Sequence, residues 1–354
     1  AVTAGPAFGY FGGGYASSAT VSTIDRIDYA NDSATAAVKG PLSNINYSLV
    51  ATGNASYGYF GGGYNPSAMQ SSIYRIDYAD DTSAAAPKGL LSGARSYMGA
   101  AGNSSYGYFG GGYTAVTGDV TTVERIDFNN DTATAAPKGN LSWSRSWGAA
   151  TGNTSYGWFG GGSPDGSKID RVDYGNDTAI AVAKGNLSVA RYYLSAVGNK
   201  NYGYWGGGHG EYSTVDRLDY GNDTATAVAK GPLSVARRIY VSAAGNKNYG
   251  YYGTGSTGNG GPEVTTVDRL DYSNDTTACV VKGPLNAARA YATAVGNADY
   301  GWWGASSGAG APDMSSIERV DYGNDTVTAA YRGPLSKGNN GYLDATGNKN
   351  YGWF

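Results

Sequence analysis

Apolar and polar positions alternate in short runs along this chain, and the runs recur at a nearly constant interval. One interval contains four of them, at residues 106–112, 122–128, 132–136 and 145–153. These runs are rich in Tyr, Val, Thr or Trp and are bounded by Gly, Asn, Asp or Pro, which is the pattern of short β-strands. No segment shows a sustained apolar period of 3.6 residues, so we expect few helices.

The interval is an internal repeat of 46 to 51 residues. Its clearest marker is a glycine set among aromatic residues, which occurs at Gly9, Gly58, Gly107, Gly157, Gly203, Gly250, Gly301 and Gly352. A four-stranded unit of about 50 residues that occurs seven times is typical of the blades of a β-propeller. We therefore predict an all-β fold in which residues 1–354 form a single domain, a seven-bladed β-propeller of four-stranded blades.

The two ends of the chain are expected to complete one blade together. The run near 342–346 would join the strands around Tyr10, Ile24 and Ala34, so that the C-terminal strand closes the ring on the N-terminal blade. A linear solenoid would also fit the period, but it would need polar capping repeats, which the sequence does not show. The fragment 351–354 is surplus to this ring, which favours a natural chain that continues beyond it.

Composition narrows the possible classes of function. Of the 354 residues, 57 are Gly, 32 are Tyr and only 15% are charged, with a formal net charge of −3. Clustered Lys and Arg, which nucleic-acid binding needs, are missing, as is the run of about 18 apolar residues that a membrane span needs. One Cys (Cys279) and one His (His209) build neither a disulfide framework nor a usual zinc site. We expect no metal, no cofactor and no catalytic residues, and therefore a protein that is not an enzyme.

A strand that ends in a run of glycines before a variable loop resembles the kelch repeat. The glycine runs lie at 12–14, 61–63, 110–112, 160–162 and 206–208, and they are altered at 253–255 and 304–306. The motifs YGYFGGG, DRIDY, NDTATA, KGPLS, AR and ATGN also resemble repeats of structural proteins of marine bacteriophages, including cyanophages. That resemblance implies a virion or tail-associated protein, located on the virion or outside the cell. The galactose-oxidase branch of the kelch fold needs two His copper ligands and a Cys–Tyr crosslink, which His209 alone cannot supply.

Most charged side chains belong to the repeat itself. Each repeat has an Arg followed two residues later by an Asp, and residues two apart on a strand share a face. Seven equivalent sets also argue against a paired-carboxylate active site. We predict that they form structural inter-blade pairs rather than ligand contacts: Arg26 and Asp28, Arg75 and Asp77, Arg125 and Asp127, Arg171 and Asp173, Arg217 and Asp219, Arg269 and Asp271, and Arg319 and Asp321.

Variation in repeat length is confined to the loop between the glycine run and the next strand, which has 6 to 11 residues. Because strands alternate in direction within a blade, all seven of these variable loops are expected on one face. The Lys-Gly turns should share that face, and the Gly-Asn and Asn-Asp turns should lie on the other. Insertions on one face of a repeat protein commonly mark its binding face.

The variable loops are rich in Tyr, Ser, Gly and Asn, the composition of adaptable recognition loops, although ordinary soluble loops share it. Aromatic rings with carboxylates and amides suit a neutral glycan. The candidate ligand-binding residues are Tyr15, Tyr64, Tyr113, Asp119, Asp165, His209, Glu211, Tyr212, Glu263 and Asp313.

Three functions of different classes remain open. The preferred one is a non-enzymatic virion or extracellular interaction module that attaches to a host-surface glycan or receptor protein through the variable-loop face. The second is a purely structural virion component that packs against other virion or surface proteins, with opposed rings of Lys/Arg and Asp favouring head-to-tail contacts between discs. The third, an extracellular glycan-active enzyme, lacks a distinguished acid/base pair.

Overall fold

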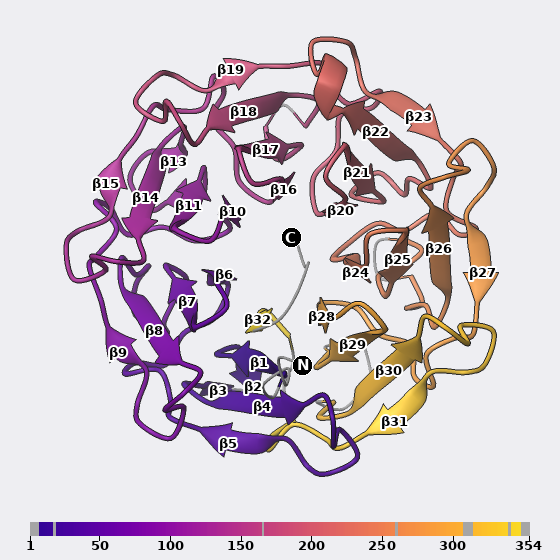
Figure 1. Ribbon diagram of the computed structural model, residues 1–354, viewed down its shortest axis with the longest axis horizontal. Helices are drawn as coiled ribbons and strands as arrows, with labels where there is room; N and C mark the ends of the chain where they lie inside the picture. The colour runs from indigo at the N-terminus through magenta and orange to yellow at the C-terminus, as the bar shows by residue number, and fades with distance from the viewer. Residues whose placement is uncertain are drawn as a thin grey trace, which may run out of the picture.

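The computed structural model describes residues 7–16, 19–164, 166–258, 261–306, 314–338 and 341–347. Within them the chain forms seven four-stranded antiparallel sheets, arranged as blades around a central axis (Figure 1). The predicted all-β, seven-bladed propeller is therefore confirmed. No helix in the described ranges is long and apolar enough to cross a membrane.

Every blade has the same strand order from the axis outward (Figure 1). The innermost strands are β32 (Asp344–Gly347), β6 (Val50–Gly53), β10 (Gly99–Gly102), β16 (Ala149–Gly152), β20 (Ser195–Gly198), β24 (Ser242–Gly245) and β28 (Thr293–Gly296). The second strands are β1 (Phe8–Gly12), β7 (Tyr57–Gly61), β11 (Tyr106–Gly110), β17 (Tyr156–Gly160), β21 (Tyr202–Gly206), β25 (Tyr249–Gly253) and β29 (Tyr300–Gly304).

The outer half of each blade is equally regular. The third strands are β4 (Ile24–Asp28), β8 (Ile73–Asp77), β14 (Val123–Asp127), β18 (Ile169–Asp173), β22 (Val215–Asp219), β26 (Val267–Asp271) and β30 (Ile317–Asp321). The outermost strands are β5 (Ala37–Lys39), β9 (Ala86–Pro87), β15 (Ala136–Pro137), β19 (Val182–Ala183), β23 (Val228–Lys230), β27 (Val280–Lys282) and β31 (Ala330–Arg332). Two variable loops add the hairpins β2 (Tyr15–Ala16) with β3 (Ala19–Thr20) and β12 (Tyr113–Thr114) with β13 (Gly118–Asp119), and one turn forms the 3₁₀ helix η1 (Tyr220–Asn222).

The C-terminal strand closes the ring, as predicted. Strand β32 pairs antiparallel with β1, with Gly347 opposite Gly9 and Asp344 opposite Gly12. The first blade is thus built from both ends of the chain. The predicted surplus fragment 351–354 lies outside the described residues.

Neighbouring blades pack through an aromatic ring laid against the first glycine of each glycine run. A Cβ atom at Gly12 would lie 2.7 Å from the ring of Phe60 in the next blade. The same contact crosses the closing junction, where a Cβ at Gly304 would lie 2.9 Å from the ring of Phe11. The next glycine, Gly13, has φ = +70°, a left-handed conformation that side chains disfavour. The glycine runs are therefore set by packing and by the turn that follows.

The outermost strand begins later than the pattern predicts. Instead of 132–136, strand β15 spans Ala136–Pro137, and Thr132 lies in a turn. The preceding segment is used for contact between blades, because the backbone N–H of Gly89 donates to the carbonyl of Asp131 and that of Ala135 donates to Leu90. Likewise β16 covers only Ala149–Gly152 of the predicted 145–153 run.

The arginines of the third strands pair with turn aspartates of the next blade. Nη1 of Arg26 lies 2.8 Å from Oδ2 of Asp81, and Nζ of Lys39 lies 3.1 Å from the other carboxylate oxygen. The hydroxyl of Tyr10 also donates to Asp81, at 2.8 Å. Asp28 instead accepts a hydrogen bond from the backbone N–H of Ala30, because it stands at the end of its strand.

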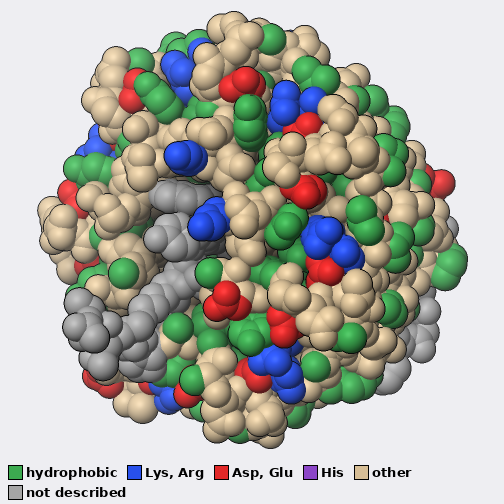
Figure 2. All heavy atoms as spheres, turned by 45° about the vertical axis from the view of Figure 1, so that its right-hand side comes forward, with side chains coloured by type: hydrophobic (Ala, Val, Ile, Leu, Met, Phe, Trp, Pro, Cys, Tyr) green, Lys and Arg blue, Asp and Glu red, His purple; other side chains and the backbone are tan. Residues whose placement is uncertain are grey.

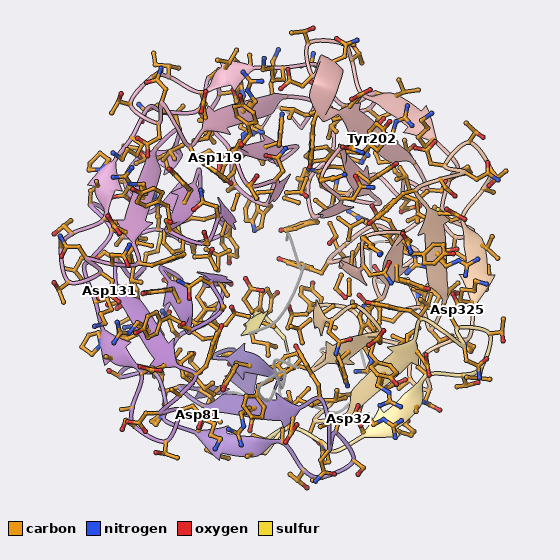
Figure 3. All side chains as sticks on the ribbon, viewed as in Figure 1. Asp32, Asp81, Asp119, Asp131, Tyr202 and Asp325 are labelled. Atoms are coloured by element: carbon orange, nitrogen blue, oxygen red, sulfur yellow. The ribbon has the colours of Figure 1, made fainter. Side chains whose placement is uncertain are left out.

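At the other junctions, too, the third-strand arginine pairs with a turn aspartate of the next blade. Figure 3 shows Asp32, Asp81, Asp131 and Asp325 at the rim between blades. The pairs are Arg75–Asp131, Arg125–Asp177, Arg171–Asp223, Arg217–Asp275, Arg269–Asp325 and Arg319–Asp32. The predicted acidic partners are therefore wrong, since these residues cap the turns that follow them: Asp28, Asp77, Asp127, Asp173, Asp219, Asp271 and Asp321.

The Lys-Gly and Asn-Asp turns meet at the rim rather than on opposite faces. The backbone N–H of Gly40 donates to the carbonyl of Asp81 at 2.8 Å. Twist within each blade makes the outermost strands run along the circumference, which brings these turns together (Figure 1). The predicted opposed rings of charge are therefore wrong. Figure 2 shows basic and acidic side chains next to one another, not gathered by sign.

Candidate functional site

Seven residues, one from each blade, surround the axis just before the innermost strands begin. We call them the axial ring: Ser48, Tyr97, Trp147, Tyr193, Tyr240, Tyr291 and Tyr342. All seven have positive φ, between 48° at Tyr240 and 59° at Tyr291. Left-handed backbone is uncommon for bulky residues and costs on the order of 1–3 kcal/mol for each. Six aromatic side chains are thus turned toward one another at a conformational cost.

The six aromatic rings form a nearly continuous wall. From Tyr97 through Trp147 and on to Tyr342, successive ring centroids lie 4.0 to 5.4 Å apart. The wall is interrupted only at Ser48, which occupies the seventh position between Tyr342 and Tyr97. Tyr240 also lies 5.6 Å from Tyr342 between ring centroids, so the aromatic rings contact one another across the axis as well as around it.

The ring residues line a pocket of about 190 Å³ together with Leu49, Met98, Leu194, Val241 and Leu343. A second cavity of about 460 Å³ follows the innermost strands and is lined mainly by Gly, Ala, Ser and Thr. Asp344 is the one charged residue among the described residues that line this channel. Its carboxylate accepts the backbone N–H groups of Ala51 and Ala345, and burial raises its pKa to about 6.

Buried ion pairs lie next to five of the ring positions. An Arg two or three residues before the ring residue meets an acid of its own blade: Arg95–Glu124, Arg145–Asp170, Arg191–Asp216, Arg237–Asp268 and Arg289–Glu318. In the second blade Asn46 and Tyr74 take these places, and this is the blade that carries Ser48. The first blade, which carries Tyr342, shows no such pair among the described residues either, and its Asp25 accepts the backbone N–H of Ser336.

Two polar atoms at the axial ring have no partner. Oγ of Ser48 and Nε1 of Trp147 are buried, and neither has a hydrogen bond in the described part of the chain. Both residues line the axial pocket. Because buried polar groups in folded proteins are nearly always satisfied, such atoms require an explanation.

Several of the predicted loop residues extend the aromatic surface outward from the ring. Tyr15 and Tyr64 lie 6.0 and 5.4 Å from Tyr47, measured between ring centroids, and Tyr47 lies 6.1 Å from Tyr342. Tyr113 stacks at 6.4 Å from Trp147. The variable loops and the axial ring therefore occupy the same face of the disc.

His209 joins this surface as a fixed side chain. Its ring stacks on Tyr192 at 4.3 Å, and its Nε2 lies 2.8 Å from Nη2 of Arg238. Desolvation and the adjacent guanidinium lower the pKa of His209 below its ordinary value. The imidazole is therefore neutral at pH 7 and accepts the hydrogen bond from Arg238.

The remaining predicted residues are not gathered at the ring. Asp119 stands opposite Tyr113 in the β12–β13 hairpin, with one carboxylate oxygen buried and unpartnered within the described ranges (Figure 3). Glu211 is exposed. The backbone of Tyr212 forms an isolated antiparallel β-bridge with that of Arg237, and the backbone of Glu263 forms one with that of Ser256. Asp165 and Asp313 lie outside the described residues.

The axial ring itself was missed by the loop-based prediction. A signal for it exists, since an aromatic residue stands five positions before the Gly of the Gly-Asn turn in six repeats, as in Tyr97 and Gly102 or Trp147 and Gly152. Hydrophobic patterning reads such a residue as part of a strand. Only the left-handed backbone, which places it at the axis, separates it from the core.

No protein-family model and no curated protein matches the chain. Solved structures do match it. YjhT is 12% identical, with a TM-score of 0.64 over 82% of this chain and 98% of that protein. A fungal alcohol oxidase of the AA5 family, solved in complex with copper, is 14% identical, with a TM-score of 0.65 over 86% of this chain and 68% of that one. The fold is a kelch-type seven-bladed β-propeller. At these identities the likeness establishes the fold alone.

The residues of this chain do not fit a copper centre of the oxidase kind. His209 is the single histidine, and it is engaged by Tyr192 and Arg238. Cys279 is buried, and desolvation raises the pKa of its thiol to about 12. No group of three His, Cys, Asp or Glu residues able to hold a metal occurs within the part of the chain that the structure describes.

Proposed function

We propose that this propeller is a non-enzymatic interaction module that attaches to a host-surface glycan through its variable-loop face. The observation that carries the proposal is the axial ring, with its pocket of about 190 Å³. Aromatic faces bind sugars because the apolar C–H side of a pyranose stacks on the ring while its hydroxyls remain available for hydrogen bonds. Tyr15, Tyr64 and Tyr113 extend this surface beyond the axis.

The charge pattern supports a neutral ligand. The residues lining the axial pocket include no Asp, Glu, Lys, Arg or His. An anionic ligand buried there would lose its hydration without meeting a counter-charge.

Association with a phage virion or tail is part of the proposal, and its support is the resemblance of the repeat motifs. Binding at several sites would strengthen such attachment, because linked modules raise the effective concentration of one another. Mass spectrometry of purified particles tests the association. If purified particles lack this protein, the proposed association with the virion is wrong, whereas the proposal of glycan binding is unaffected.

A structural role by rim packing is the second candidate, favoured by the outermost strands. Val38, Val228 and Val281 on β5, β23 and β27 are each more than half exposed. Pro87 and Pro137 remove an N–H from β9 and β15, whereas these three strands keep theirs. Part of the rim is therefore open to a neighbouring subunit.

A glycan array separates the two functions. The wild type is compared with a protein whose seven variable loops are replaced by one short consensus loop, and with a rim variant, Val38→Ser/Val281→Ser. Glycan attachment predicts that the loop variant loses most of its signal while the rim variant keeps it. Unchanged binding by the loop variant, or no glycan signal from the wild type, would overturn the proposal.

A further inference from the structure

We propose that the channel along the axis binds the primary ammonium group of an aliphatic molecule on the carboxylate of Asp344. The site is the cavity of about 460 Å³ that follows the innermost strands, and its volume falls in the range of cavities that hold small organic ligands. The inference goes beyond the proposed glycan attachment, which uses the variable-loop face.

Hydrogen bonds place this carboxylate on the axial side of the innermost strands. At the turn after β6, the N–H of Asn54 donates to the carbonyl of Tyr57. Hydrogen-bonded pairs alternate along an antiparallel ladder, so Ala51 and Phe60 form a pair without hydrogen bonds, and the N–H of Ala51 points away from β7 toward the axis. Oδ2 of Asp344 accepts this N–H at 2.7 Å. The carboxylate therefore lies where β32 and β6 face the axis (Figure 1).

Asp344 has no counter-charge within the described ranges. Its oxygens accept from the backbone N–H groups of Ala51 and Ala345 and from the hydroxyl of Thr293, all of which are neutral donors. Buried carboxylates at the rim, such as that of Asp81, meet cationic side chains instead. Burial raises the pKa of Asp344 to about 6, so most of the group is still ionised at pH 7.5. Because a buried charge without a partner is costly, a cation from solution would stabilise it.

The lining of the channel favours a monovalent cation that carries hydrogen-bond donors. No other Asp, Glu, Lys, Arg or His lines it in the part of the chain that the structure describes. Calcium usually takes six to eight oxygen ligands, with carboxylates among them. An ammonium group has three N–H donors, and Ser195 and Thr293, which stand at the same strand position as Asp344, offer hydroxyl acceptors beside the carboxylate.

Apolar side chains at this end of the channel suit a hydrocarbon chain. Met98, Leu194 and Val241 line the channel directly before the first residues of their innermost strands, just as Leu343 stands directly before Asp344. Contact with these side chains stabilises an alkyl group but not a hydrated metal ion. We therefore expect an alkylammonium ion to bind in preference to an inorganic cation.

Methionine methyl signals provide a direct test. The chain has three Met, and Met98 lines the channel, so a ¹H–¹³C spectrum of the methyl-labelled protein reports binding there. Met98→Leu assigns the signal by its loss. The protein is titrated at pH 7.5 with n-hexylammonium chloride and with hexan-1-ol, its uncharged match. The Met98 signal should shift with hexylammonium and respond at least about tenfold more weakly to the alcohol, while Met69, in a variable loop, stays fixed.

A charge variant measures the contribution of the carboxylate. Asp344→Asn keeps the size of the side chain and should weaken hexylammonium binding at least about tenfold, as the loss of a hydrogen bond to a charged group predicts. Asp28→Asn, the matched control, removes the same charge at the end of β4 and should stay within about twofold. Near-ultraviolet circular dichroism confirms that each variant retains the native fold, and the comparison with hexan-1-ol stands without any variant.

Three outcomes would overturn this inference: equal affinity of Asp344→Asn and the wild type, equal binding of hexan-1-ol and hexylammonium, or no shift of the Met98 signal. Tighter binding of potassium or calcium chloride than of hexylammonium would contradict the ammonium assignment. The glycan-array signal of Asp344→Asn should equal that of the wild type, because the variable-loop face is unchanged. Failure of the channel site therefore leaves glycan attachment intact, and an array without signal leaves the channel site intact.

Discussion

Arg26 and Asp81 belong to neighbouring blades, and Nη1 of the arginine lies 2.8 Å from Oδ2 of the aspartate. Asp81 also accepts from Tyr10 and faces Lys39, so one carboxylate holds three side chains of the preceding blade. Removing one partner from such a cluster leaves buried charges uncompensated. The ring of blades is therefore held together by turn residues.

The first prediction follows from this cluster. Asp81→Ala should lower the free energy of unfolding by about 3–5 kcal/mol, because Arg26 and Lys39 lose their counter-charge. Asp28→Asn is the matched control, since its amide oxygen can still accept the N–H of Ala30. Urea unfolding should show a change below about 1 kcal/mol for the control. Equal effects of the two variants would contradict the observed pairing.

The buried pairs behind the axial ring give a second prediction. Arg237→Met strands the carboxylate of Asp268, which is fully buried, and should cost about 3–5 kcal/mol. The double variant Arg237→Met/Asp268→Leu removes both charges and should recover most of that loss. Thermal unfolding of the single and double variants measures the difference. A double variant less stable than the single one would show that the pair is not the source of the effect.

Packing between blades is tested at one glycine. In Gly110→Ala the new Cβ would lie 2.6 Å from the ring of Phe159 in the next blade, so either the ring or the backbone must shift. We expect a loss of about 1–3 kcal/mol, the usual range for overpacking. Gly93 offers the control, because a Cβ there meets nothing within 4 Å. Chemical denaturation compares the two alanine variants, and the same stability in both would argue against close contact between blades.

Asp344 predicts a pH dependence. Its pKa is about 6 in the folded protein against 3.8 as the ordinary value, so the folded state holds its proton more tightly. The contribution of Asp344 to stability is thus greatest below about pH 4, falls as the pH rises toward 6, and is constant above that. As the pH rises through this window, the free energy of unfolding of Asp344→Asn should increase relative to that of the wild type by up to about 3 kcal/mol.

The comparison of variants is needed because burial also raises the pKa of Asp25. Thermal unfolding of the wild type and of Asp344→Asn at several pH values between 4 and 7.5 isolates the contribution of Asp344. A difference between the two proteins that does not change with pH would show that this carboxyl group titrates normally.

Features that repeat could be predicted from the sequence. The blade count, the strand order and the closure by the last strand follow from the period and from the two incomplete ends. The motif around Gly9 and Gly12 recurs because the next blade places an aromatic ring against each copy. Repetition thus converts a weak local signal into a strong one.

Contacts between repeats could not be predicted in the same way. Arg26 and Asp28 are two residues apart, so spacing suggests a pair, but the guanidinium reaches a turn 55 residues away because twisted blades meet at the rim. The axial ring depends on left-handed backbone at residues such as Tyr240, which a pattern of apolar positions does not encode. In both the inter-blade ion pairs and the axial ring, the direction of the backbone determines which residues meet.

A crystal structure with the oligosaccharide that gives the strongest array signal tests the central claim most directly. The account predicts density for the oligosaccharide on the variable-loop face, against the aromatic side chains of the axial ring and the neighbouring loop residues Tyr15, Tyr64 and Tyr113. Density for the oligosaccharide at the rim or in the channel near Asp344, with the axial pocket left to solvent, would contradict it.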